Sequence, residues 1–270
     1  MAGRIREAIE VVFLSRLASK RAVVTGASSG IGEGIAGAFA DERAEVTVWG
    51  RDPERTAAVC ARISERGGTA HEAIGDVSDP ADVERIVGEA ASTMGGIDVV
   101  VNCAGIGELD GWVPVHEHSL DAWQRTLAVN ATGPFLISKA AIPHMLEQGG
   151  GAFLHISSVC SITVWAGDSA YSVSKAALNM LSDHIAVEYG DKGIRSNTLC
   201  PGEILTPMHE TAANASPDAK EWERAVLSKH PIGRFGEVEE VAQAAVFLCS
   251  DEAAFMTGAN VPIDGAYSRV

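Results

Sequence analysis

The residues of this chain with the clearest chemical potential are Tyr171 and Lys175, in the stretch AYSVSK. Side chains four positions apart lie on the same face of a helix. A free phenol has a pKa of about 10 and is a poor acid or base near neutral pH, but a neighbouring cation favours the phenolate and lowers that pKa. The spacing therefore predicts a tyrosine acid/base. Taken alone, it also fits an ordinary amphipathic helix.

Such a pair needs a scaffold, and the chain alternates short β-rich runs with longer helical stretches. Strand patterns that end in turn residues cover 21–26, 45–50, 97–105, 151–158, 194–202 and 259–265, with a weaker strand at 69–77. Helical patterns cover 31–42, 52–67 and 79–95, and the last two open with Asp-Pro, a helix-start signal. This alternation predicts an α/β fold: a Rossmann-type doubly wound sheet of about seven mostly parallel strands, with helices on both faces.

The length and continuity of the chain indicate a single domain. Its 270 residues suffice for one α/β domain with a large core, and no repeat or linker divides them. We expect an N-terminal extension over residues 1–20 and a single catalytic domain over residues 21–270. The polar stretch 203–235 interrupts the alternation just after a strand end, where a substrate lid is expected.

Composition and charge argue against several function classes. A net charge of −15 makes nucleic acid and anionic lipid poor partners, and no apolar run reaches the length of a membrane span. The five cysteines lie at no metal-site or redox-motif spacing, which favours reduced thiols in the cytoplasm. The histidines, including His116 and His118, also lack a ligand spacing, so no metal site is predicted.

A glycine-rich turn, VVTGASSGIG, joins the first predicted strand to the first predicted helix. Gly26, Gly30 and Gly32 allow the backbone to turn tightly and to approach a pyrophosphate closely. The helix start behind them offers unpaired N–H groups and the positive end of its dipole. The strand–turn–helix context makes a dinucleotide site the preferred interpretation over a plain connecting turn.

The chain resembles the short-chain dehydrogenase/reductase family through several motifs in register. TGASSGIG, NCAG, ISS, YSVSK and PGEILT occur in the family's order and spacing, from about Arg21 to Tyr267. The nearest general pattern is that of 3-oxoacyl-carrier-protein reductases. NCAG departs from the family's usual Asn-Asn-Ala-Gly, because Cys103 replaces the second asparagine.

The resemblance implies four catalytic residues: Asn130, Ser158, Tyr171 and Lys175. Tyr171 would exchange a proton with the substrate oxygen, and Lys175 would lower its pKa and bind the nicotinamide ribose. Ser158, which is favoured over Ser157 by its spacing to Tyr171, would hold the substrate oxygen. Asn130 would kink its helix and hold a water that links Lys175 to solvent, although a purely structural kink is the alternative.

The remaining cofactor contacts also follow from the resemblance. Besides Tyr171 and Lys175, the expected cofactor-binding residues are Gly26, Ser28, Ser29, Gly30, Ile31, Gly32, Arg51, Asp76, Val77, Asn102, Ala104, Gly105, Pro201, Gly202, Ile204 and Thr206. Asp76 could instead cap a turn.

The predicted cofactor is NADP(H), with NAD(H) as the alternative. Where an NAD site carries an acid, the second strand here ends in Gly50 followed by Arg51, whose guanidinium suits a 2′-phosphate. Two other possibilities stay open. Arg51 could pair with Asp52 or Glu54 in solvent, or Asp52 could itself reach the ribose and favour NAD.

The expected substrate is a small carbonyl or secondary alcohol compound, bound against Trp165, with Trp112, Met208 and His209 as further pocket candidates. The expected assembly is a homotetramer, with a dimer as the alternative. Two rival functions remain: an NADP(H)-sensing protein without turnover, and a lyase or epimerase that uses Tyr171 as a base and recycles its cofactor.

Overall fold

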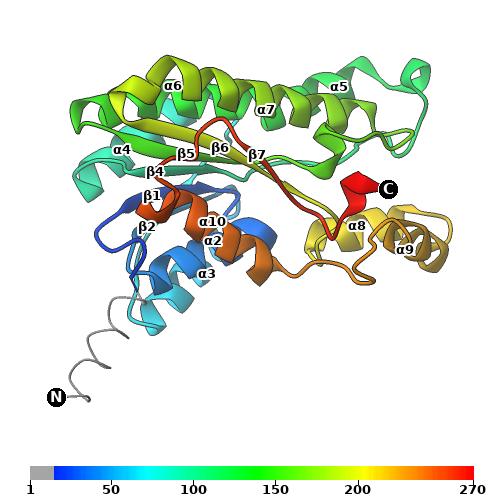
Figure 1. Cartoon of the computed structure of the whole chain (residues 1–270), viewed down its shortest axis with the longest axis horizontal. Helices are drawn as coiled ribbons and strands as arrows, with labels where there is room; N and C mark the ends of the chain where they lie inside the picture. The colour runs from blue at the N-terminus through cyan, green and yellow to red at the C-terminus, as the bar shows by residue number, and fades with distance from the viewer. Residues whose placement is uncertain (1–14) are drawn as a thin grey trace.

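One seven-stranded parallel sheet forms the centre of the molecule (Figure 1). The computed structural model describes residues 15–270. The strands are β1 (Arg21–Thr25), β2 (Glu45–Gly50), β3 (Thr69–Ile74), β4 (Val99–Asn102), β5 (Gly151–Ile156), β6 (Ile194–Pro201) and β7 (Asn260–Ile263). Their order is β3-β2-β1-β4-β5-β6-β7, so the winding reverses between β1 and β4, where doubly wound sheets bind ligands. The predicted fold class is confirmed.

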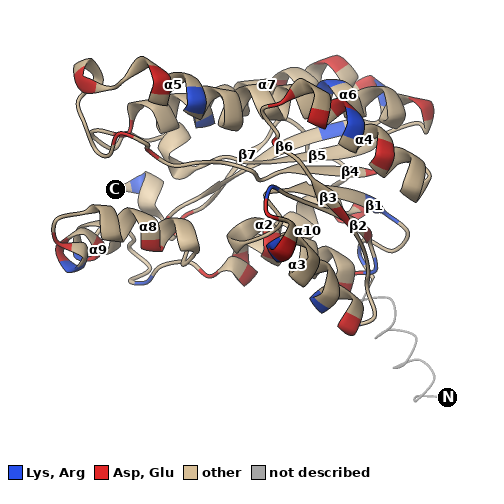
Figure 2. Cartoon of the chain, turned by 180° about the vertical axis from the view of Figure 1, so that it is seen from behind, with Lys and Arg blue, Asp and Glu red and all other residues tan. Residues whose placement is uncertain are grey.

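Helices cover both faces of the sheet. One layer holds α2 (Gly30–Asp41), α3 (Pro53–Glu65) and α10 (Val238–Cys249), and the other holds α4 (Pro80–Met94), α5 (Leu120–Leu127), α6 (Gly133–Glu147) and α7 (Ser169–Tyr189). The two Asp-Pro signals work as predicted, because Asp52 accepts a hydrogen bond from the backbone N–H of Arg55, and Asp79 from that of Ala81. Charged residues lie mainly on these helices and on the loops (Figure 2).

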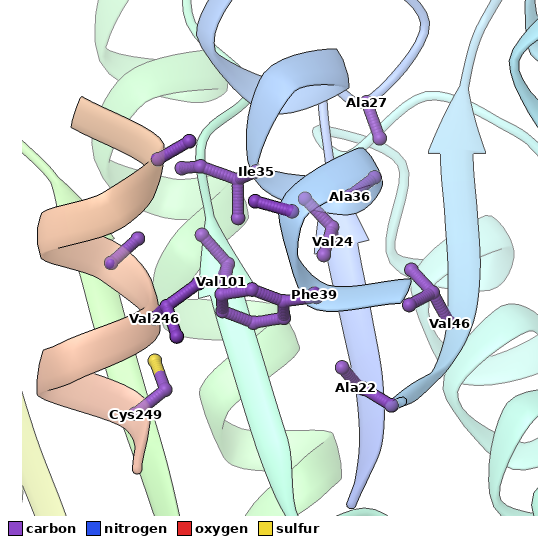
Figure 3. Packing of buried hydrophobic residues seen from close by; sticks show 14 of the residues in the cluster. Ala22, Val24, Ala27, Ile35, Ala36, Phe39, Val46, Val101, Val246 and Cys249 are labelled. Carbon is purple, nitrogen blue, oxygen red and sulfur yellow. The ribbon is translucent and has the colours of Figure 1, made fainter. Parts of the chain in front are cut away.

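Apolar side chains fill the space between each helical layer and the sheet. On one side Phe39 of α2 and Val246 of α10 pack against Val24 and Val101 of the strands (Figure 3). On the other side Ile86 of α4 and Ile137 of α6 belong to a second cluster. Because both faces of the strands are covered, the central strands are continuous apolar runs, as the sequence predicts.

The predicted lid region contains two short helices, α8 (Pro207–Ala215) and α9 (Ala219–Leu227). In the chain they follow β6 and precede α10, and in space they lie side by side at one end of the molecule (Figure 1). An isolated β-bridge between Ile204 and Gly236 closes the base of this excursion. The short single-turn segments are Val115–Glu117, Val159–Ser161, Gly190–Lys192, Asp251–Ala253 and Tyr267–Arg269.

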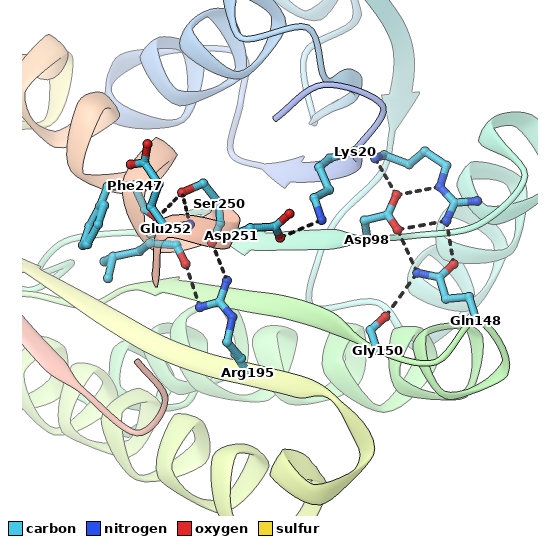
Figure 4. Close-up of polar contacts among 11 residues, drawn as sticks. Lys20, Asp98, Gln148, Gly150, Arg195, Phe247, Ser250, Asp251 and Glu252 are labelled. Atoms are coloured by element: carbon cyan, nitrogen blue, oxygen red, sulfur yellow. Dashed lines mark hydrogen bonds and ion pairs between the residues drawn. The ribbon is translucent and has the colours of Figure 1, made fainter. Parts of the chain in front are cut away.

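Residues 15–20 of the predicted extension pack against the domain. Leu17 is fully buried in the core, and Arg16 forms an ion pair of 2.7 Å with Glu42. The Lys20 ammonium lies 3.0 Å from the Asp251 carboxylate, close to the Arg195 guanidinium that binds the carbonyl oxygen of Ser250 (Figure 4). Residues 1–14 of the extension lie outside the described part of the chain.

Candidate active site

A cavity of about 670 Å³ lies at the carboxyl ends of the strands. Its walls come from the segments that follow β1, β2, β4, β5 and β6, from the start of α7 and from the lid helices. This is the edge at which doubly wound sheets place their ligands. One cavity therefore contains both the glycine-rich turn and the tyrosine–lysine pair.

The glycine-rich turn has the tight geometry that a pyrophosphate site needs. Gly26 and Gly30 have φ angles of +65° and +56°, which side chains disfavour. A Cβ atom on Gly26 would lie 2.8 Å from the Cα of Ala104, and one on Gly32 would collide with the carbonyl oxygen of Gly26. The side chain of Ser29, the N-cap of α2, makes no capping hydrogen bond. The open helix start fits a bound phosphate.

Nearly all of the predicted cofactor residues line this cavity. They are Gly26, Ser28, Ser29, Gly30, Ile31, Gly32, Arg51, Asp76, Val77, Ala104, Gly105, Tyr171, Lys175, Pro201, Gly202, Ile204 and Thr206. Asn102 is the exception. Its side chain is buried behind the wall, with Nδ2 3.2 Å from Nδ1 of His155. Asn102 therefore lies beneath the cavity wall and does not itself line the cavity.

Asp76 combines the two roles considered for it. Its Oδ1 accepts hydrogen bonds from the backbone N–H and the hydroxyl of Ser78, which is turn capping. Its Oδ2 lies 2.9 Å from the Arg125 guanidinium. Burial alone would raise the pKa of Asp76, but these hydrogen bonds and the guanidinium lower it to about 2. A fixed carboxylate therefore stands in the cavity wall.

The end of β2 presents two guanidinium groups to the cavity. Arg51 and Arg55 both line it, and Arg55 was not identified from the sequence. The carboxylate of Asp52 caps α3 and lies 3.5 Å from Nε of Arg55. Among residues 15–270, Arg51 has no ion pair with either Asp52 or Glu54. Gly50 is also tightly enclosed, because its Cβ would lie 2.8 Å from Cβ of Ser28.

The start of α7 and the end of β5 bring the predicted catalytic groups together. Lys175 is buried, with Nζ 5.5 Å from the centre of the Tyr171 ring and donating to the carbonyl oxygen of Ile156 at 2.9 Å. The Ser158 hydroxyl accepts a hydrogen bond from the backbone N–H of Cys160 at 3.1 Å, and it lies close enough to Tyr171 to lower the pKa of the phenol. Ser157 instead donates to the backbone carbonyl of Lys175 at 3.0 Å, which ties α7 to β5. The geometry thus assigns the two serines different places.

The expected lowering of the Tyr171 pKa is not found. Burial raises the pKa of this phenol above its usual value, and the nearby Ser158 hydroxyl opposes the change only in part. Burial also lowers the pKa of Lys175, to about 8. The Lys175 ammonium lies over the Tyr171 ring, 5.5 Å from its centre, and not against the phenol oxygen. Its charge therefore lowers the pKa of Tyr171 less than burial raises it. The raised pKa favours the protonated phenol, which can donate a proton.

Asn130 lies within a π-helical segment, Ala128–Thr132, between α5 and α6. Its Nδ2 donates to the carbonyl oxygen of Ile106 and to the hydroxyl of Ser174, and its Oδ1 accepts from the backbone N–H of Ile106. A Cβ on Gly105 would lie 3.3 Å from Nζ of Lys175 and 3.5 Å from Oδ1 of Asn130. The predicted kink is present, and Asn130 sits behind the cavity wall near Lys175.

The substrate end of the cavity has aromatic and acidic walls. Trp165 and the three other pocket candidates line it, and the rings of Trp112 and Trp165 meet edge-on at 6.1 Å. Cys160 is in the wall, whereas Cys200 is buried behind it. Besides Arg55, the polar and aromatic cavity residues that were not identified from the sequence include Glu108, Asp168, Glu203, Trp222 and Tyr267. Two of these had a positional signal: Glu108 follows NCAG, and Asp168 precedes Tyr171 by one turn.

Comparisons with known proteins agree with this arrangement. The family model described as Enoyl-(Acyl carrier protein) reductase matches residues 26–268. A 2,5-dichloro-2,5-cyclohexadiene-1,4-diol dehydrogenase of Sphingobium indicum is 37% identical, over 94% of this chain and 98% of that protein. Glucose 1-dehydrogenase 2 of Bacillus subtilis is 38% identical, over 92% and 95%.

A solved structure extends the likeness to three dimensions. The crystal structure of a short-chain type dehydrogenase/reductase from Mycobacterium marinum superimposes with a TM-score of 0.86 at 34% identity, covering 93% of this chain and 96% of that one. Fold, motif order and sequence identity over nearly the whole length all agree. The chain belongs to the short-chain dehydrogenase/reductase family.

Proposed function

We propose that this protein is an oxidoreductase that transfers a hydride between NADP(H) and a ketone or secondary alcohol, with Tyr171 as the general acid/base. The observation that carries the proposal is that Ser158 and Lys175 flank Tyr171 in the cavity that also contains the glycine-rich turn. Relatives named as dehydrogenases of a diol and of glucose support the substrate class.

The residues of the chain would divide the chemistry between them. In reduction, the Tyr171 hydroxyl donates its proton to the carbonyl oxygen, and in oxidation the tyrosine takes a proton from the alcohol. The Ser158 hydroxyl donates a hydrogen bond to the same oxygen and stabilises the charge that develops on it. Lys175 holds a positive charge beside the ring. The glycine turn would hold the pyrophosphate of the cofactor and the wall from Pro201 to Thr206 its nicotinamide, which would supply the hydride chemistry.

The preference for NADP(H) over NAD(H) rests on the end of β2. Asp52, the acid that could reach a ribose hydroxyl, is engaged as the N-cap of α3 and lies beside Arg55. Arg51 and Arg55 therefore offer donors to a 2′-phosphate. This arrangement favours the doubly charged group over a free hydroxyl.

One observation argues against the sensing protein, which has no need for Ser158, Tyr171 and Lys175 around a single cavity. A lyase or epimerase would use Tyr171 as a base, as alcohol oxidation does, so turnover of the cofactor has to separate it from the oxidoreductase. Net change in the nicotinamide separates these functions directly.

The test is a screen of ketones and secondary alcohols with each cofactor, followed by nicotinamide absorbance. We expect stoichiometric oxidation or reduction, with a higher kcat/KM for NADP(H). Tight cofactor binding with no net turnover of any compound would favour the sensing protein. Product formation without a change in absorbance would favour the lyase or epimerase.

A further inference from the structure

Two carboxyl groups meet at the substrate end of the cavity, on the loop after β4 and at the start of α7. Glu108 and Asp168 both line the cavity. Only 4% of the Glu108 side chain and 3% of Asp168 are exposed. The two segments are closely packed, since a Cβ on Gly167 would lie 2.8 Å from the carbonyl carbon of Trp112. The carboxyl pair is therefore held rigidly in the wall.

The surroundings of Asp168 favour its protonated form. Burial raises the pKa of Asp168 to about 7, and the neighbouring Glu108 acts in the same direction, while Cys160 and the hydroxyl of Ser172, which donates to Oδ2 at 3.2 Å, oppose it. Two buried carboxylates in contact cannot both ionise at low cost. A pair of this kind can accept one hydrogen bond and donate another.

The capping role of Glu108 leaves one of its oxygens free. Oε1 accepts a hydrogen bond from the backbone N–H of Tyr171 at 2.9 Å, which fixes the start of the catalytic helix. No N–H or hydroxyl group among residues 15–270 donates to Oε2. His118, whose side chain is 5% exposed, lies 3.7 Å from Oε2, and neither of its ring nitrogens has a hydrogen-bond partner within that range.

Such orphaned polar atoms are uncommon in a buried site and point to a missing donor. Helix capping accounts for Oε1 of Glu108. It does not account for Oε2 of Glu108 or for the two ring nitrogens of His118, which have no hydrogen-bond partner among residues 15–270. A ligand that reaches this wall would meet the side chains of Glu108 and Asp168, with Nδ1 of His118 3.7 Å from the unpartnered Oε2 of Glu108.

The charge at this end selects against anions. Glu203 joins Glu108 and Asp168 in the wall. Among the described residues that line the cavity, the lysines and arginines are Arg51 and Arg55, which stand at the end of β2, and Lys175, which binds the carbonyl oxygen of Ile156. These carboxyl groups would repel a carboxylate or phosphate on the substrate. The Lys229 ammonium lies outside the lining, 4.8 Å from the ring centre of Trp165 and 5.6 Å from that of Tyr267.

We propose that the Glu108–Asp168 pair binds a second hydroxyl group of the substrate, so that the enzyme acts on small neutral diols or polyols and the corresponding hydroxy ketones. This inference rests on the proposed function. Oε2 of Glu108 would accept a hydrogen bond from the substrate hydroxyl group, and the protonated carboxyl of Asp168 would donate a hydrogen bond to the hydroxyl oxygen. The rings of Trp112 and Trp165 offer apolar faces to the carbon skeleton.

The first part of the test compares substrates of one ring size: cyclohexanol, the cyclohexanediols, 2-aminocyclohexanol and 3-hydroxycyclohexanecarboxylate. We expect kcat/KM for at least one diol to exceed that for cyclohexanol by about tenfold or more, the gain of one hydrogen bond to a charged group. A preference for the amino alcohol or the carboxylate over every diol would overturn the proposal, as would equal use of diols and cyclohexanol.

The second part uses Glu108→Gln and Asp168→Asn, with Asp110→Asn as the matched control. Asp110 lies on the same loop and, like Glu108, 3.7 Å from Nδ1 of His118, but its oxygens accept hydrogen bonds from Ser119 and it does not line the cavity. In both test variants the diol-to-cyclohexanol ratio of kcat/KM should fall about tenfold, mainly through a higher KM for the diol, while the control keeps the wild-type ratio.

A merely structural role of Glu108 as a helix cap predicts something different: equal loss of kcat for both substrates and an unchanged ratio. That result in both folded variants, checked by cofactor binding, would refute the proposal. Failure of the proposed function is distinguishable, because the wild type would then turn over neither cyclohexanol nor any diol with either cofactor.

Discussion

At the scale of single residues, burial shifts the pKa values of the proposed catalytic pair, Tyr171 and Lys175. It raises the pKa of Tyr171 and lowers that of Lys175 to about 8, so that near neutral pH both carry their protons. A phenol beside an ammonium is the state required to protonate a carbonyl oxygen. The geometry of the pair therefore matches ketone reduction at neutral pH.

The proposed preference for NADP(H) can be tested at Arg51, an exposed side chain that lines the cavity at the end of β2. We predict that Arg51→Ala weakens kcat/KM for NADP(H) by at least tenfold and spares that for NAD(H), because a charge-assisted hydrogen bond contributes about 1.5–3 kcal/mol. Arg62→Ala is the control, since Arg62 pairs with Glu33 and does not line the cavity. Equal loss with both cofactors, or a wild type that prefers NAD(H), would contradict this role of Arg51.

Asp168 should make the stability of the fold depend on pH. Its pKa is raised from 3.8 to about 7, so between these values the folded state binds more protons than the unfolded state. Stability contributed by the protonated carboxyl is then lost as pH rises from about 4 to about 7. Asn has no such titration.

We therefore predict that the free energy of unfolding of Asp168→Asn, relative to wild type, increases between pH 4 and pH 7 by on the order of 3 kcal/mol. Urea unfolding at several pH values measures this difference. A constant difference across that range would show that Asp168 is not protonated in the fold.

At the scale of elements, the sequence predicted the features that local patterns encode, and it did not predict contacts between distant segments. Strands β1 to β7 and helices α2 to α4 follow from local patterns, such as the apolar runs and the Asp-Pro starts. The order of motifs predicted Ser158 and Tyr171 at one site because strand ends of a parallel sheet converge.

Contacts between distant segments could not be predicted in this way. Glu108 caps the backbone of Tyr171 across 63 positions, and Asn130 joins Ile106 and Ser174 across 24 and 44. No local pattern encodes such pairs. The same holds for burial, which reversed the expected direction of the Tyr171 pKa shift.

The glycine turn gives an element-scale prediction. Gly32→Ala places a Cβ against the carbonyl oxygen of Gly26, so the turn must open, and we expect cofactor affinity to fall by at least tenfold. Gly88→Ala in α4 is the matched control, because no atom lies within 4 Å of its added Cβ. That variant should bind cofactor normally and be more stable by up to about 1 kcal/mol. Cofactor titration by fluorescence compares the two, and equal affinities would contradict the close approach at the turn.

At the scale of the whole molecule, helix α7 carries an apolar stripe on its outer face. Val173, Met180 and Val187 are exposed and seven positions apart, so they lie along one line of the helix. Phe135 of the neighbouring α6 is exposed as well. Symmetric association is the usual way in which soluble proteins bury such surfaces. A homotetramer built through α6 and α7 remains our prediction, with a dimer as the alternative.

Sedimentation of the wild type and of Met180→Lys tests this assembly. The lysine should shift the protein to a smaller species, while Val115→Lys, an exposed apolar position on the loop after β4, should leave the assembly intact. A wild type that sediments as a monomer at micromolar concentration would rule out the tetramer and the dimer together.

The most direct test of the account is turnover by Tyr171→Phe, which removes the hydroxyl from the centre of the site and keeps the ring that packs near Lys175. We predict that kcat with the best substrate of the screen falls by about 10²–10⁴, the usual contribution of a positioned general acid, while the Kd of the nicotinamide cofactor stays within about threefold of wild type. A folded variant that binds cofactor and turns over at nearly the wild-type rate would contradict the assignment of Tyr171 as the proton donor.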